Sequence, residues 1–108
     1  MQDLSLSNEI EAVAVVVQGL VDAEFAKTVV VTPGSALDQV GLKDGLLIVR
    51  VHLKYGEFGV AFDHVLYMIR EVDLSIPPET YVIMRRAARA MKSGEEELKA
   101  VKVSPGAG

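Results

Sequence analysis

The chain has 108 residues, which is enough for one domain with a single hydrophobic core. Half of the residues are apolar, which excludes a disordered chain, and the absence of cysteine excludes a disulfide framework, a zinc–cysteine site and a thiol nucleophile. The net charge of -4 argues against a dedicated nucleic-acid binder, because such proteins normally carry a basic face.

The two ends of the chain differ in composition from the segment between them. Residues 1–11 are polar and acidic and lack the basic start and apolar core of a signal peptide, so we expect a flexible segment there. Residues 12–104 are expected to form the folded domain, and residues 105–108 a disordered tail. No segment approaches the roughly 18 apolar residues of a membrane span, so membrane insertion is not expected.

Short β-branched runs predict strands in the first half of the chain. Residues 12–18 (AVAVVVQ) and 28–32 (TVVVT) are short and rich in valine, and residues 46–53 (LLIVRVHL) form the clearest strand pattern. Between them, residues 33–35 (PGS) predict a turn, and residues 36–40 predict one helical turn capped by the serine.

Residues 63–72 are expected to form the main helix, with Asp63 as its N-cap. This helix has two apolar stripes, one of Phe62, Leu66 and Ile69 and one of Val65, Met68 and Val72. A helix on the outside of a small domain needs only one stripe for the core, so the second stripe would need a binding partner. The alternative, that both stripes belong to the core, stays open.

Residues 77–94 fit two structures. The Pro-Pro-Glu start, the alanine and arginine content and Gly94 as a cap favour a helix, whereas residues 81–84 (YVIM) favour a short strand. We favour a strand over residues 80–86, then a loop, and a last strand over residues 98–104, where apolar residues alternate.

One stretch is more specific than these local patterns. Residues 29–51 (VVVTPGSALDQVGLKDGLLIVRV) contain an ordered set of turn and apolar residues: Pro33, Gly34, Ser35, Ala36, Gly41, Leu42, Lys43 and Gly45. Their order and spacing resemble the core signature of bacterial PDZ domains of the HtrA protease type. The resemblance implies an α/β, mostly β fold, a partly open barrel of five to six strands with one main helix and a short helical turn.

The same resemblance implies a peptide-binding groove. In that fold a polypeptide segment or a protein C-terminus would add as a strand beside residues 13–17, and the main helix would line the pocket. The implied peptide-binding residues are Val13, Ala14, Val15, Val16 and Val17 on the strand, and His64, Val65, Met68 and Val72 on the helix. Ala14 stands where the family has a glycine. The chain would then serve an HtrA-type protease or a secretion system, and this resemblance alone favours a periplasmic location.

A second hypothesis is a structural or assembly domain whose groove is filled by its own chain or by another subunit, including self-association. Neither hypothesis involves catalysis, a cofactor or a metal. Ser35 lies in a turn rather than in a nucleophile elbow, and His52 and His64 are twelve residues apart without an acidic pair at ligand spacing. The chain is therefore not expected to be an enzyme.

A basic cluster is the remaining feature: Arg85, Arg86, Arg89 and Lys92. A phosphate or RNA contact is one interpretation of it. We favour a solvated face whose charge residues 95–97 (EEE) could neutralise, and no nucleic-acid partner is expected.

Overall fold

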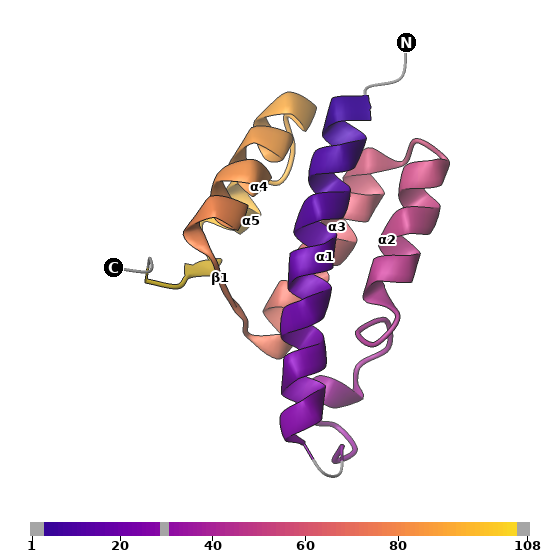
Figure 1. Ribbon diagram of the computed structural model, residues 1–108, viewed down its shortest axis with the longest axis vertical. Helices are drawn as coiled ribbons and strands as arrows, with labels where there is room; N and C mark the ends of the chain where they lie inside the picture. Colours follow the sequence, from indigo (N-terminus) through magenta and orange to yellow (C-terminus); the bar gives the residue numbers. More distant parts are fainter. Residues whose placement is uncertain (1–3, 29–30, 106–108) are drawn as a thin grey trace.

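The computed structural model describes residues 4–28 and 31–105, and this part of the chain is mostly helical (Figure 1). Within it, four longer helices carry the fold: α1 (Leu4–Lys27), α2 (Gly45–Lys54), α3 (Phe58–Val72) and α4 (Pro78–Met91). The short elements are the 3-10 helix η1 (Ala36–Asp38), the helix α5 (Glu95–Leu98) and the strands β1 (Ser75–Ile76) and β2 (Lys102–Val103). Helix α1 lies in front of α3 in Figure 1, between α2 and α4, and packs against all three.

Helix α1 forms because its apolar residues recur with helical spacing. The buried residues Leu6, Ile10, Val13, Val17 and Val21 lie three or four positions apart and so share one face. Burying a side chain of this size stabilises the fold by roughly 1.5–3 kcal/mol. That gain exceeds the cost of up to about 0.7 kcal/mol that a valine brings to a helix.

Burial along α1 distinguishes a helix from the predicted strand. A strand would place Val13, Val15 and Val17 on the same face. In the structure Val13 and Val17 are fully buried, whereas Val15 is 47% exposed. The same reasoning applies to α2, where Gly45, Val49 and Leu53 are buried at intervals of four residues.

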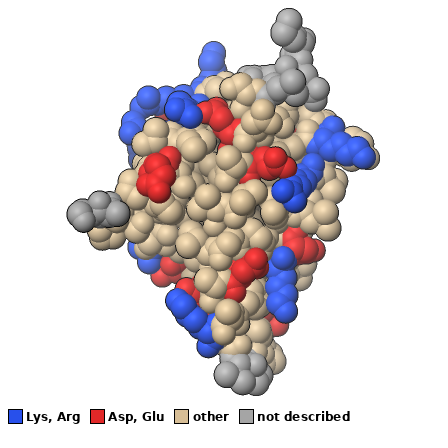
Figure 2. All heavy atoms as spheres, viewed as in Figure 1, with Lys and Arg blue, Asp and Glu red and all other residues tan. Residues whose placement is uncertain are grey.

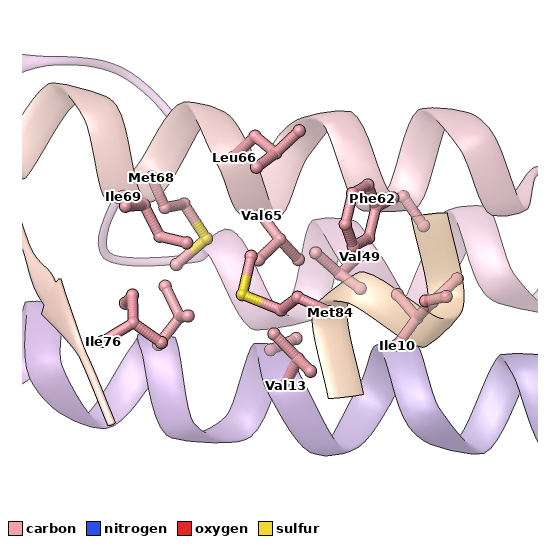
Figure 3. Packing of buried hydrophobic residues seen from close by; sticks show 14 of the residues in the cluster. Ile10, Val13, Val49, Phe62, Val65, Leu66, Met68, Ile69, Ile76 and Met84 are labelled. Carbon is pink, nitrogen blue, oxygen red and sulfur yellow. The ribbon is translucent and has the colours of Figure 1, made fainter. Parts of the chain in front are cut away.

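Helix α3 is at the centre of the core. It packs against α1 and α2, and its buried residues are Ala61, Phe62, Val65, Leu66, Met68 and Ile69. Figure 3 shows Val65 meeting Val13 of α1 and Met84 of α4. Both apolar stripes of this helix therefore serve the core, with Val72 half-buried at its end. The alternative left open by the sequence is confirmed, and the second stripe needs no external partner.

Helix α4 occupies the stretch that the sequence left ambiguous. Pro78 lies at its start, where the missing N–H costs nothing, and Lys92 ends it with a left-handed φ of 54°. The buried residues Thr80, Met84, Ala87 and Ala88 recur at helical spacing and face α1 or α5. The helical alternative for this stretch is correct, and the strand over residues 80–86 is wrong.

The connection between α1 and α2 matches part of the prediction. The Ser35 N–H donates to the Thr32 carbonyl at 3.0 Å, which closes the predicted turn, and η1 follows it. Two α3 side chains hold the end of this connection. The Tyr67 hydroxyl donates to the Val40 carbonyl at 2.6 Å, and His64 Nε2 lies 2.9 Å from the Gly41 carbonyl oxygen.

The mostly β, PDZ-like barrel predicted from the resemblance is wrong. Residues 12–18 lie in α1, residues 46–53 lie in α2, and within residues 98–104 only Lys102–Val103 is a strand. This strand pairs in parallel with β1, Ser75 with Lys102 and Ile76 with Val103, and makes the one two-stranded sheet of the described residues. Helical spacing of the buried side chains outweighed the β propensity of the valine-rich runs.

The expected ends of the domain also differ from the structure. Residues 4–11, expected to be flexible, form the first turns of α1 and bury Leu6 and Ile10 in the core. Of the predicted strand over residues 28–32, Thr28, Val31 and Thr32 have no regular structure, and residues 29–30 lie outside the described part. Residues 1–3 and 106–108 also lie outside it.

Candidate assembly interface

The residues predicted to receive a peptide strand lie on α1. Val13, Ala14 and Val17 are buried against the core, Val16 is half-buried, and Val15 points outward. An α-helix uses its backbone N–H groups within the helix. The strand-addition mechanism needs a free strand edge, and these residues have none.

The residues predicted to line the pocket lie on α3, and α3 packs directly against α1. Val65 and Met68 are fully buried, so side chains fill the space in which a groove was expected. His64 Nε2 faces the carbonyl oxygen of Gly41 at 2.9 Å. Because a carbonyl only accepts, this nitrogen carries the proton and donates it. The structure thus brings the two predicted sets together, but as parts of one core.

The three helices at the front and flanks of the view in Figure 1 carry exposed apolar residues. Val15 on α1 is 47% exposed, Leu47 and Val51 on α2 are 64% and 46% exposed, and Val82 on α4 is 51% exposed. Two ion pairs between helices show which residues of α1 lie beside which residues of α2 and α4. Arg50 Nε lies 2.8 Å from Glu11 Oε1, and Arg86 Nη2 lies 2.7 Å from Glu9 Oε2.

Three of these apolar residues lie one helical turn beyond the ion pairs, while Val51 is next to Arg50 in the sequence. Glu11 pairs with Arg50, and Gln18 bonds to the N–H of Leu46, so α2 runs antiparallel to α1. One turn along both helices from the ion pair are Val15 and Leu47. These two exposed side chains therefore lie at the same level of neighbouring helices.

The same argument places Val82 on the other flank of α1. Helix α4 also runs antiparallel to α1 (Figure 1), and Val82 precedes Arg86 by one turn. Beyond the Glu9–Arg86 pair, one turn along α1 leads to Ala12 and Val13. We call Val15, Leu47, Val51 and Val82 the apolar band, because they are the exposed large apolar residues of α1 and of its neighbours α2 and α4.

The outer surface of α1 between the ion pairs is made mostly of small or uncharged residues. Its exposed positions follow one another at intervals of three and four residues: Ser5, Asn8, Ala12, Val15, Gly19, Asp22 and Ala26. Figure 2 shows the result, a central uncharged area bordered by Lys, Arg, Asp and Glu side chains. A second helix could approach this surface closely, because short side chains leave little bulk above the backbone.

The charges at the borders are distributed unequally along α1. Toward the N-terminal half of α1 lie Arg50 and Arg86. Toward its C-terminal half lie Asp22, Asp44 and Glu79, which are exposed and belong to none of the ion pairs among the described residues. At one end of the apolar band the two arginines are thus neutralised by Glu11 and Glu9, whereas the carboxylates at the other end have no such cation among the described residues.

Sequence reasoning missed this face apart from Val15. Leu47, Val51 and Val82 lie in segments predicted as strands. In a strand, successive side chains point to opposite faces, so burial would follow a period of two residues. The signal that could have found them is helical: Leu47 and Val51 are four residues apart, on the side of α2 opposite Val49 and Leu53.

No group of three or more His, Cys, Asp or Glu side chains among residues 4–28 and 31–105 could hold a metal ion. No described helix combines the length and the apolar character needed to cross a membrane. No protein family, no curated protein and no solved structure matches the chain.

Proposed function

We propose that this chain is an assembly module that forms a symmetric dimer through the apolar band and the outer surface of α1. The observation that carries the proposal is the alignment of Val15, Leu47 and Val82 across three helices of one face. Exposed apolar side chains that cluster on one face mark interaction surfaces, whereas single ones need no explanation.

The charge distribution favours an antiparallel over a parallel arrangement of the two copies. A two-fold axis perpendicular to α1, in the plane of the interface, sets the two α1 helices antiparallel and keeps α2 opposite α2. The Arg50–Glu11 pair of one copy then faces the acidic end, with Asp22 and Asp44, of the other. Parallel helices would instead bring the carboxylates of Asp22 and Asp44 against Glu79. Like charges across an interface are unfavourable, so the antiparallel dimer is the complementary one.

The face is large enough for a stable dimer. The two longer dimensions of the molecule are 46 and 36 Å, and Figures 1 and 2 look down on that side. A standard interface covers about 800 Å² of each partner, which is roughly an eighth of the 6542 Å² that the described chain exposes. The apolar band and the outer surface of α1 lie within such an area.

The proposal is tested by the mass of the protein in solution. Sedimentation equilibrium should give twice the chain mass of 11.7 kDa at high micromolar concentration. Val15→Glu should give the monomer mass, because the two-fold axis brings the new charges of both copies together in a desolvated contact. Val60→Glu on α3 is the matched control, since Val60 is 49% exposed and lies on none of the three interface helices. It should sediment as the wild type does.

Two outcomes would refute this function. A wild-type protein that stays monomeric at these concentrations has no self-assembly to explain. A dimer that survives Val15→Glu but is lost in Val60→Glu uses a different face. Circular dichroism on each variant checks that the helices are intact, and the exposure of both valines means that either charge can be solvated in the monomer.

A further inference from the structure

Two arginines of α4 line a hollow between that helix and α5. Arg85 and Arg89 lie one turn apart and share a cavity of about 290 Å³ with Lys99, Tyr81, Glu95 and Leu98. A smaller hollow of about 110 Å³ adjoins the same two arginines and includes Arg86 and Val82. Arg85 and Arg89 are therefore accessible on both sides.

The cavity is positively charged although the whole chain is acidic. Its lining contributes the two arginines against one carboxylate, Glu95, because its third cation, Lys99, is paired with Glu96, whereas the chain has a net charge of -4. Residues 95–97 (EEE) were expected to neutralise the basic cluster, but their side chains have different surroundings. Glu96 Oε1 pairs with Lys99 Nζ at 3.0 Å, and Glu97 lines another cavity beside α3.

The two arginines differ from their neighbour in what they bind. Arg86 donates from Nε and Nη2 to the same Glu9 oxygen, at 2.9 and 2.7 Å. Arg85 and Arg89 make no ion pair among the described residues. Their guanidinium groups keep all of their donors for a ligand.

The cavity wall suits an anion with a small organic body. The Tyr81 hydroxyl donates to the Leu98 carbonyl at 3.2 Å, which holds the tyrosine ring and the buried Leu98 side by side at the cavity. Guanidinium groups match the oxygens of phosphate in geometry and charge, and an aromatic ring offers an apolar surface next to them. We propose that this cavity binds a phosphate group, with Arg85 and Arg89 as its main ligands. The proposal is independent of dimer formation.

The test is a titration of the ¹⁵N-labelled protein at constant ionic strength, followed by NMR. Inorganic phosphate and phenyl phosphate are the probes, and sodium chloride is the control for screening. Phosphate should shift the amide signals of Tyr81, Arg85, Arg89 and Leu98, and chloride should not. Tighter binding of phenyl phosphate indicates a phosphate ester as the natural ligand, and equal binding indicates free phosphate.

Variants separate this site from general attraction to a basic surface. Replacing both arginines, Arg85→Gln with Arg89→Gln, should weaken phosphate binding at least tenfold. Arg70→Gln on α3 is the matched control, because Arg70 is exposed, has no ion pair among the described residues and lines a different cavity. The proposal is overturned if neither probe shifts the named signals, or if the double variant binds phosphate as the wild type does.

Discussion

The side-chain Oε1 of Gln18 accepts a hydrogen bond from the backbone N–H of Leu46 at 2.7 Å, across 28 residues of sequence. The same side chain donates from Nε2 to the Leu42 carbonyl and to Asp22 Oδ1, each at 3.0 Å. Gln18 is buried, and Leu46 lies in the first turn of α2, where a helix has free N–H groups. One amide thus fixes the start of α2 against α1.

Replacing this amide should destabilise the protein. Gln18→Ala leaves the Leu46 N–H without its partner and the Leu42 carbonyl with only the Gly45 N–H, and we expect a loss of about 1–3 kcal/mol in the free energy of unfolding. Urea denaturation measures it. Gln39→Ala, at an exposed position, is the control and should change stability by less than about 0.5 kcal/mol. Equal effects of the two substitutions would mean that the Gln18 bonds do not hold α2.

Replacing Gly41 by alanine is expected to lower stability more than the same replacement at Gly56, which has a similar backbone conformation. Its φ is 85°, and a Cβ there would lie 2.9 Å from Cε1 of His64. Gly56 has a φ of 73° but no neighbour within 4 Å. Gly56→Ala should cost about 1–2 kcal/mol for the left-handed backbone alone. Gly41→Ala should cost more, because it also displaces His64 from its hydrogen bond. Thermal unfolding compares the two, and identical costs would argue against the close approach of His64.

Gly59 tests where α3 begins. The sequence predicted a helix that begins at Asp63, whereas the structure places Gly59 in the first turn of α3, where a Cβ would have no neighbour within 4 Å outside its own helix backbone. Gly59→Ala should therefore stabilise the protein by up to about 1 kcal/mol, the helical preference of alanine over glycine. Chemical denaturation measures the change. A loss of stability in Gly59→Ala would mean that Gly59 does not lie in the helix.

Phe62 is the largest side chain in the centre of the core, and it also contacts the turn before α5. It is 1% exposed, and a Cβ on Gly94 would lie 2.9 Å from its ring. Phe62→Ala should cost about 3–5 kcal/mol through the cavity it leaves. Phe58→Ala removes the same group from a half-buried position of the same helix and should cost clearly less. A similar cost for both would place Phe62 outside the core.

The sequence predicted the elements whose local signals agree with their packing. The turn at residues 33–35, the short helical turn after it and a helix over residues 63–72 are present in the structure, but this helix begins at Phe58, so Asp63 lies inside it and is not its N-cap. Helices α1 and α2 were missed because valine-rich runs have high β propensity, and that preference is weak compared with burial. The helical spacing from Leu6 to Val21 was visible, but it begins in residues that were set aside as flexible.

The candidate interface could not be derived without the fold. Val15, Leu47 and Val82 are far apart in sequence, and only the ion pairs of Glu9 and Glu11 with α4 and α2 show that they share one level. The PDZ resemblance placed Val15 on a strand edge, for which the structure offers no counterpart. Sequence reasoning raised self-association as an alternative, but it could not say which face would carry it.

Single-cysteine cross-linking tests the antiparallel dimer most directly, because the natural chain has no cysteine. Val15→Cys lies near the two-fold axis and should form a disulfide-linked dimer on mild oxidation. Ser5→Cys and Ala26→Cys should each remain uncross-linked alone, but an equal mixture of the two should cross-link, since the exposed ends of α1 are opposed. Failure of Val15→Cys to cross-link, or efficient cross-linking of Ser5→Cys alone, would contradict the proposed assembly.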